Sequence, residues 1–296
     1  RILERARRLF QPANDFEVTL EANPGTVERG RFADYRGAGV TRVSLGAQSF
    51  DDQRLAALGR IHSSRETRGA VEELRAAGLD NFNLDLMYAL PQQSLEGALA
   101  DLEQALALGP AHVSHYQLTL EAGTAFERRP PPLPDDDAAF AMQEACAARL
   151  AAAGFRQYEV SAWAPPGREC RHNLNYWHFG DYLGIGAGAH GKLTDPLAGA
   201  VLRTARVRQP GRYLAAAAPE ARVEESRRLG ADDLAFEYFL NVLRLVGTDS
   251  APAASKRARD CRGRPSPGRW RRPGHVACCG RSRRTVGCPR RWGGAS

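Results

Sequence analysis

Acidic and amide side chains stand near the ends of three apolar segments. Glu21 ends residues 16–21, Gln48 lies near the end of residues 42–49, and Asp85 lies within residues 81–87. A carboxylate can accept two hydrogen bonds from a ribose diol, and Gln48 offers both a donor and an acceptor. An acid in an apolar strand is costly unless it is paired, so Asp85 indicates either a functional role or an internal salt bridge. Glu21 taken alone fits a solvated acid at a turn.

Two further motifs carry chemistry. Arg60, within Leu58-Gly-Arg-Ile-His-Ser, could grip a carboxylate through two parallel N–H bonds, although a lone arginine is usually a surface residue. His172 is followed by Tyr176 and Trp177. An imidazole can ligate heme iron while aromatic rings cover the porphyrin; the alternative is a structural histidine.

Two other patterns are rejected as sites. Residues 184–191 are glycine-rich, but they do not have the glycine spacing of a dinucleotide loop, and no convincing strand precedes them. We expect close backbone packing there. His275, Cys278, Cys279 and Cys288 have poor spacing for zinc.

The elements that must position these residues alternate between strands and helices. Apolar runs predict strands at residues 16–21, 42–49, 81–87 and 112–120. Amphipathic or capped segments predict helices at residues 27–37, 65–77, 95–108, 135–153, 211–217 and 232–245. This βαβ rhythm predicts a parallel sheet or barrel, in which function gathers at the carboxyl ends of the strands.

Charge separates a body from a tail. Residues 251–296 contain 12 arginines and Lys256 against Asp260, a net charge of +12, so residues 1–250 carry −5 of the total of +7. The tail has almost no large aliphatic side chains, and we predict that it is disordered. One hypothesis is that it is translated from a shifted reading frame. No membrane-spanning run or signal peptide is visible, which favours a cytoplasmic protein.

We therefore predict a domain over residues 1–130, a second region over residues 131–249 and a basic tail over residues 250–296. A nucleic-acid-binding function would rest on the arginine-rich tail alone. We rank it last, because the tail shows no other feature of a nucleic-acid interface.

The order of the motifs is more specific than any one of them. Along the chain they are Glu21-Ala-Asn-Pro, Val43-Ser-Leu-Gly-Ala-Gln-Ser-Phe, Leu58-Gly-Arg-Ile-His-Ser, Asn83-Leu-Asp-Leu-Met-Tyr-Ala-Leu-Pro and His115-Tyr-Gln-Leu-Thr-Leu-Glu. This series resembles the oxygen-independent coproporphyrinogen III oxidase group of the radical S-adenosylmethionine superfamily. His172-Asn-Leu-Asn-Tyr-Trp resembles the His-Asn-x-x-Tyr-Trp pattern of HemW-type heme chaperones. The resemblance covers roughly residues 10–247.

The resemblance implies a partial (β/α)6 radical S-adenosylmethionine barrel that lacks its first strands, a small C-terminal α/β region and a disordered tail. It implies that Glu21, Gln48, Arg60 and Asp85 contact S-adenosylmethionine. It also implies that His172, Tyr176 and Trp177 bind heme, with His172 as the iron ligand. The implied partners are heme and a heme-acceptor protein, with membrane-associated acceptors possible. The alternative function is a coproporphyrinogen III oxidase.

The sequence departs from this family in one respect. The Cys-x3-Cys-x2-Cys that would hold a [4Fe–4S] cluster is absent from the 296 residues, and we expect it to precede Arg1. Whether the chain is an enzyme is therefore uncertain, and we expect it to be inactive in radical chemistry. Loss of the first strands would also leave residues 16–21 as an exposed sheet edge, so we predict poor stability or aggregation.

Overall fold

The computed structural model describes residues 1–25 and 30–247. Its main sheet has six strands in the order β1-β2-β3-β4-β6-β5. The strands are β1 (Thr19–Ala22), β2 (Arg42–Gln48), β3 (Phe82–Tyr88), β4 (His112–Gln117), β5 (Arg156–Glu159) and β6 (Ala162–Ala164). The first four are parallel, whereas β6 is antiparallel to β4 and to β5. The fold class is therefore mixed α/β with a parallel sheet, as predicted; β1 and β5 are its outer strands and do not pair with each other.

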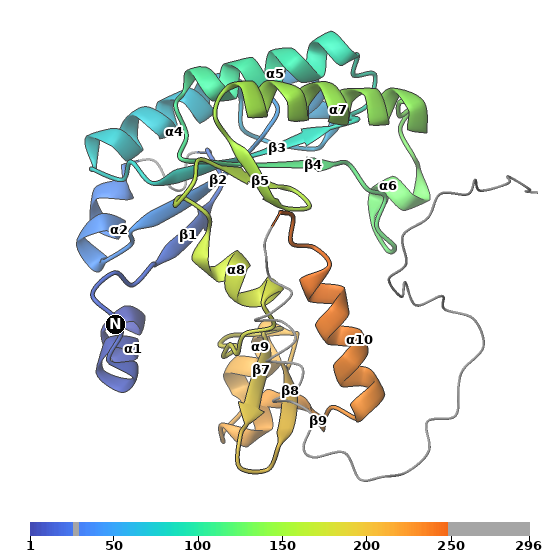
Figure 1. Cartoon of the computed structure of the whole chain (residues 1–296). Coiled ribbons are helices and arrows are strands. Elements are labelled where there is room, and N and C mark those ends of the chain that lie inside the picture. Colours follow the sequence, from blue (N-terminus) through green and yellow to red (C-terminus); the bar gives the residue numbers. More distant parts are fainter. Residues whose placement is uncertain (26–29, 248–296) are drawn as a thin grey trace, which may run out of the picture.

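Helices cover one face of this sheet. They include α4 (Ser64–Ala76), α5 (Leu95–Ala107) and α7 (Asp136–Ala152), which lie above the strands in Figure 1. The shorter helices α1 (Ile2–Phe10), α2 (Phe32–Ala38), α3 (Asp52–Ala57) and α6 (Ala125–Arg128) lie in the connections and at the N-terminus. The main core forms where the sheet meets these helices, and every residue of β2 is buried.

Local sequence signals set the helix boundaries. Ser63 caps α4, and the predicted capping box with Glu66 is present. The side chains of Ser94 and Asp135 accept backbone N–H bonds at the starts of α5 and α7. Gly78 follows α4 with a positive φ of 72°. The predicted strands and helices are confirmed to within a few residues, except at the start of α2: it begins at Phe32, and residues 26–29 lie outside the described range.

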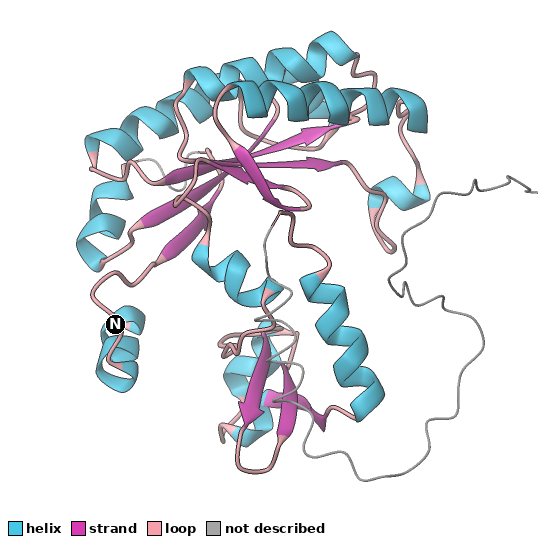
Figure 2. Ribbon diagram, in the orientation of Figure 1, coloured by secondary structure: helices cyan, strands magenta, loops and turns pink. Residues whose placement is uncertain are grey.

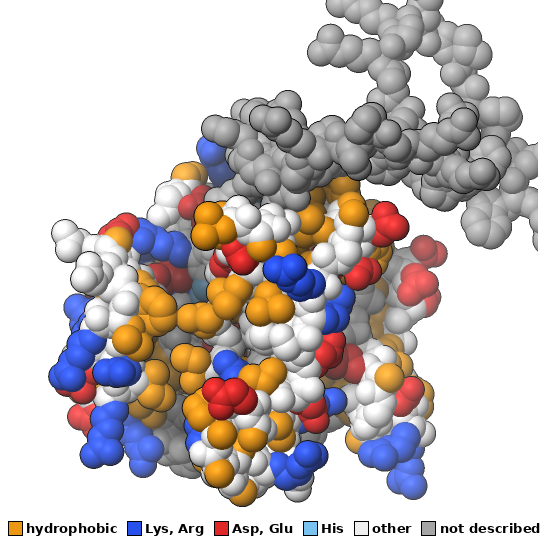
Figure 3. All heavy atoms as spheres, turned by 90° about the horizontal axis from the view of Figure 1, so that it is seen from below, with side chains coloured by type: hydrophobic (Ala, Val, Ile, Leu, Met, Phe, Trp, Pro, Cys, Tyr) orange, Lys and Arg blue, Asp and Glu red, His pale blue; other side chains and the backbone are white. Residues whose placement is uncertain are grey.

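A second, antiparallel sheet lies below the first (Figure 2). It consists of β7 (His190–Asp195), β8 (Ala200–Arg206) and β9 (Val223–Arg228), next to α9 (Pro210–Ala215), a 3₁₀ turn (Glu220–Arg222) and α10 (Ala231–Val242). Between the two sheets runs α8 (Arg171–Trp177). Hydrophobic side chains spread across the middle of the lower face in Figure 3. Phe236, Phe239, Leu240 and Leu243 of α10 and its C-terminal end are exposed.

The glycine-rich segment packs closely, as the sequence predicts. A Cβ on Gly184 would lie 2.1 Å from the carbonyl oxygen of His190, and one on Gly191 would lie 2.7 Å from Thr204 Oγ1. Real Cβ atoms do not approach so closely, so positions 184 and 191 require glycine for the segment before β7 to lie against that strand.

Three predictions concern other parts of the chain. The predicted disordered tail, its reading-frame hypothesis and its cysteines fall on residues outside the described range. Among the described helices, none has the length and apolar character to span a bilayer. As expected, β1 is an outer strand of the main sheet; the aggregation predicted from this edge remains a prediction.

Candidate functional site

A polar cavity of about 250 Å³ opens beside the parallel strands. Glu21, Arg42, Asp85, Tyr116 and His172 line it, together with Ser44, Ser114, Cys170 and Asn173. Side chains alternate between the faces of a strand, so Arg42 and Ser44 of β2 share one face. The register pairs Ser44 with Asn83 and Asp85 with Ser114. Neighbouring strands thus bring polar groups from distant parts of the sequence into one cavity.

Asp85 is half-buried, and uncharged side chains donate hydrogen bonds to it. Ser44 Oγ donates to Asp85 Oδ2 at 3.2 Å, and Asn83 Nδ2 donates to Asp85 Oδ1 at 2.8 Å. Burial raises the pKa of Asp85, the hydrogen bonds oppose this effect, and the nearby Glu21 charge adds to it. Within the described residues Asp85 has no cationic partner, so the internal salt bridge considered from the sequence does not form there.

Glu21 lies at the rim of the same cavity. Its side chain is exposed, and among the described residues it forms no hydrogen bond or ion pair. Both carboxylate oxygens are therefore available to accept hydrogen bonds from a ligand.

Gln48 and Arg60 lie around the cavity and are not part of its lining. Tyr116 Oη, whose pKa burial raises to about 12, donates to Gln48 Oε1 at 2.8 Å. Gln48 has a positive φ of 66°, an uncommon conformation for a residue other than glycine. The exposed Arg60 donates to Asn23 Oδ1 at 3.4 Å. The structure thus connects Gln48 to the cavity through Tyr116, and Arg60 to the loop after β1 through Asn23.

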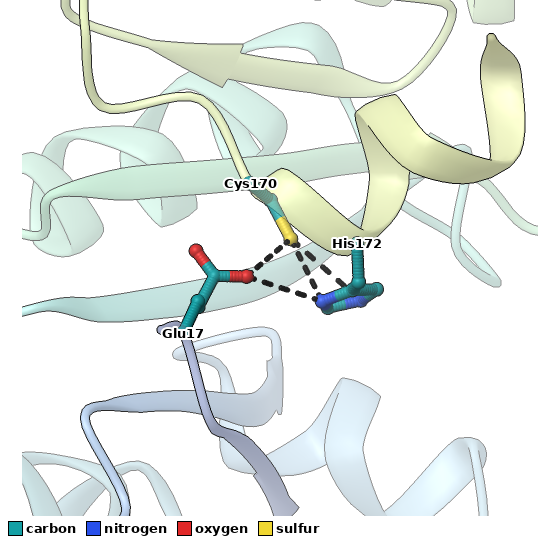
Figure 4. A group of neighbouring side chains, drawn as sticks. All are labelled: Glu17, Cys170 and His172. Carbon is teal, nitrogen blue, oxygen red and sulfur yellow. Dashed lines mark hydrogen bonds and ion pairs between the residues drawn. The ribbon is translucent and has the colours of Figure 1, made fainter. Parts of the chain in front are cut away.

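His172 contacts two side chains that sequence reasoning did not single out (Figure 4). Its Nδ1 lies 3.0 Å from Cys170 Sγ and 3.5 Å from Glu17 Oε1. The Cys170 hydrogen bond, followed by that of Glu17, raises the pKa of His172 to about 9. Burial alone would raise the pKa of Glu17, but hydrogen bonds from His172 and the Arg171 amide lower it to about 2. In this arrangement His172 is an imidazolium at neutral pH.

Tyr176 and Trp177 leave α8 in different directions. A helix turns by about 100° per residue, so residue 176 lies on nearly the same face as residue 172, whereas residue 177 points away from it. The rings of His172 and Tyr176 are 6.3 Å apart. The Trp177 ring lies under Arg244, 4.4 Å from its guanidinium carbon, and together with Tyr176 it lines a second hollow of about 210 Å³. The structure thus brings Tyr176, but not Trp177, to His172.

Glu17, Arg42 and Cys170 are among the residues of the site that the sequence analysis missed. Glu17, Thr19 and Glu21 alternate along the chain, and with His172 they line a neighbouring hollow of about 300 Å³. This alternation was the available signal for Glu17. Arg42 is only 3% exposed, and its Nε has no hydrogen-bond partner within residues 1–25 and 30–247. An arginine that begins an otherwise apolar strand was the signal there.

The described cysteines do not fit an iron–sulfur cluster. Cys146 is a residue of α7 and belongs to the main core cluster. Cys170 belongs to a smaller core cluster with Tyr158. Residues 1–25 and 30–247 therefore do not supply three converging thiolates.

Comparison with known proteins identifies the family. Residues 1–105 match the family model of the radical SAM superfamily. The chain is 51% identical over 256 residues to the heme chaperone HemW of Escherichia coli K12, covering 85% of this chain and 65% of that protein. HemW of Haemophilus influenzae is 48% identical over 245 residues, 83% of this chain and 63% of that protein. The chain belongs to the HemW-type branch of the radical S-adenosylmethionine superfamily.

The match covers only part of the length of these relatives. The chain spans slightly less than two thirds of the length of these two HemW proteins. Among solved structures, coproporphyrinogen III oxidase HemN of Escherichia coli has a TM-score of 0.71 at 20% identity. The match covers 87% of this chain and 62% of HemN, and it shows a common fold.

Proposed function

We propose that this HemW-type chain binds S-adenosylmethionine and heme and passes the heme to an acceptor protein. The observation that carries the proposal is that Glu21, Asp85 and His172 line one cavity. The HemW relatives named above are heme chaperones by name. The proposed cofactor residues and the proposed heme ligand would then act side by side.

In this proposal the strand ends hold the nucleoside. Glu21 would accept hydrogen bonds from the two ribose hydroxyls, because its oxygens are free among the described residues. Asp85 would orient the ligand from within the cavity, and Gln48 would fix the wall through Tyr116. Arg60 would hold the carboxylate of the amino-acid part. S-adenosylmethionine would supply the sulfonium and nucleoside that these residues recognise.

Heme binding is assigned to the exposed side of α8. His172 would coordinate the iron, and Tyr176 would lie beside the porphyrin edge. An imidazolium has no free lone pair, so His172 must lose one proton before it binds iron; loss of the Nε2 proton would leave Nδ1–H directed at Glu17. Trp177 would contribute from the neighbouring hollow, which Tyr176 also lines.

Heme titration tests this assignment. The Soret band of the full chain is recorded with increasing heme for the wild type, His172→Ala and His190→Ala. His190 is an exposed histidine of β7 and serves as the matched control. We expect His172→Ala to shift and weaken the band, and His190→Ala to leave it unchanged. Identical spectra for His172→Ala and the wild type would remove His172 as the ligand.

The oxidase remains the second candidate because the coproporphyrinogen III oxidase HemN shares the fold. That reaction requires a [4Fe–4S] cluster held by three cysteines, and the described residues do not supply them. Conversion of coproporphyrinogen III by this chain under anaerobic, reducing conditions would favour the oxidase.

A further inference from the structure

Three side chains from two distant segments form a cluster beside the cavity. Glu17 precedes β1, whereas Cys170 and His172 begin α8. One potential ligand atom from each lies within 4.8 Å of the other two. Figure 4 shows the carboxylate, the sulfur and the imidazole turned toward a common point.

We propose that Glu17, Cys170 and His172 form a binding site for a zinc-like divalent ion. This site shares His172 with the proposed heme site, so the ion and the heme iron would compete for one imidazole, which must lose a proton to bind either. A thiolate, an imidazole and a carboxylate are all ligands that Zn²⁺ accepts. This set contains one of each, and its sulfur and nitrogen favour borderline ions over Mg²⁺ or Ca²⁺.

The distances between the three ligand atoms fit a zinc ion. Zinc–ligand bonds of about 2.0–2.3 Å at tetrahedral angles place the ligand atoms about 3.4–3.6 Å from one another. The observed separations are 3.8 Å from Cys170 Sγ to Glu17 Oε1 and 3.5 Å from Glu17 Oε1 to His172 Nδ1. From Cys170 Sγ the imidazole nitrogens lie at 3.0 Å (Nδ1) and 3.6 Å (Nε2). Shifts of a few tenths of an ångström, which the half-exposed His172 can make, would close the site.

The surroundings hold two of the ligands in place. The Arg171 amide donates to Glu17 Oε2 at 3.4 Å, which leaves Oε1 facing the cluster. Cys170 is 0% exposed, and its amide donates to Tyr158 Oη at 3.4 Å. Such supporting contacts orient metal ligands and strengthen binding.

One coordination position stays open. Cys170 and His172 line the cavity of about 250 Å³, and Glu17 and His172 line the neighbouring hollow of about 300 Å³. Three protein ligands with an open fourth position are typical of zinc sites that exchange a water or a substrate, whereas closed structural sites have four. We therefore expect a metal that can be loaded and removed from the folded chain.

Cobalt provides a readout that identifies the sulfur ligand. Co²⁺ accepts the same geometry, and a cobalt–thiolate bond gives a charge-transfer band in the near ultraviolet. The tail cysteines Cys261, Cys278, Cys279 and Cys288 could bind cobalt too. All measurements therefore use the full chain with these four changed to serine. Cys170→Ser and Glu17→Gln are the test variants, and Cys146→Ser, in the other core cluster, is the matched control.

We expect one Co²⁺ per chain, displaced by Zn²⁺, with the charge-transfer band lost in Cys170→Ser and kept in Cys146→Ser. Glu17→Gln should weaken binding by more than the roughly 10–100-fold typical of losing a supporting contact. If Cys170→Ser does not fold, Glu17→Gln still tests the site, because it leaves the buried cysteine unchanged. No stoichiometric binding by the parent chain, or an unchanged band in folded Cys170→Ser, would overturn the proposal. The heme assignment is tested apart from this site by the Soret band of the metal-free parent chain: a normal heme band together with no cobalt binding refutes this site alone.

Discussion

Acidification should destabilise the fold through two buried histidines. Burial lowers the pKa of His115 to about 4, and burial together with the Arg42 charge lowers that of His112 to about 3. An unfolded histidine has a pKa near 6.5. At a pH between the folded-state and unfolded-state pKa values, these histidines are protonated in the unfolded chain and neutral in the folded chain. The free energy of unfolding therefore falls as the pH falls below 6.5.

The size of the effect follows from this linkage. Between pH 7.5 and pH 5.5 each histidine should cost roughly 1 kcal/mol of folding stability. The loss is complete only when the pH reaches the folded-state pKa. Carboxyl groups such as Asp85 and Asp101, whose pKa burial raises, act in the opposite direction. A comparison between variants cancels their contribution.

Urea unfolding at pH 7.5 and at pH 5.5 measures this loss of folding stability. The perturbation is His115→Gln, because the pKa of His115 is lowered by burial alone. The exposed His190→Gln is the matched control. We expect His115→Gln to lose about 1 kcal/mol less on acidification than the wild type, whatever its stability at pH 7.5, and His190→Gln to lose as much as the wild type. An equal loss in His115→Gln and the wild type would refute the reasoning.

Three further outcomes are expected. Glu21→Gln should weaken S-adenosylhomocysteine binding, followed by calorimetry, about 10-fold or more, because hydrogen bonds to a charged acceptor contribute about 1.5–3 kcal/mol; equal affinity would exclude Glu21. Asp101→Ala should lower the free energy of unfolding by about 1–3 kcal/mol, because it leaves the buried Phe50 N–H without its 2.7 Å acceptor. Gly184→Ala should lower the melting temperature, because its Cβ would meet His190. Gly211→Ala, which has open space, should not.

The sequence predicted the four parallel strands of the main sheet for a simple reason. Apolar runs of strand length, separated by capped helices, specify parallel strands, and the register then places Ser44, Asp85 and Ser114 side by side. Asp85 was recognisable because an acid interrupts an apolar run. Glu21 and Asp85 share a cavity because β1 and β3, on either side of β2, expose them on the same face of the sheet.

The contacts of α8 could not be predicted in the same way. His172 meets Glu17, which lies 155 residues earlier, and no local pattern specifies that meeting. The grouping of Trp177 with His172 as heme-binding residues stays a prediction. Helical geometry separates residues five apart by about 140° around the axis. Once residues 171–177 are known to be helical, Tyr176 is the aromatic neighbour of His172, as observed.

A hydrogen-bond chain joins the strand ends to α8. Asn83 Nδ2 donates to Asp85, so its Oδ1 must accept, and His112 Nδ1 donates to it at 2.7 Å. His112 Nε2 then accepts from Tyr158 Oη at 2.7 Å.

The same Tyr158 oxygen accepts from Asn173 Nδ2 at 3.2 Å and from the Cys170 amide at 3.4 Å. This order of donors requires a neutral His112, which agrees with its lowered pKa. A change in protonation or position at Asp85 therefore has a continuous polar route to the helix that carries His172. The proposed nucleoside and heme groups would be linked through neutral, satisfied contacts in the buried interior.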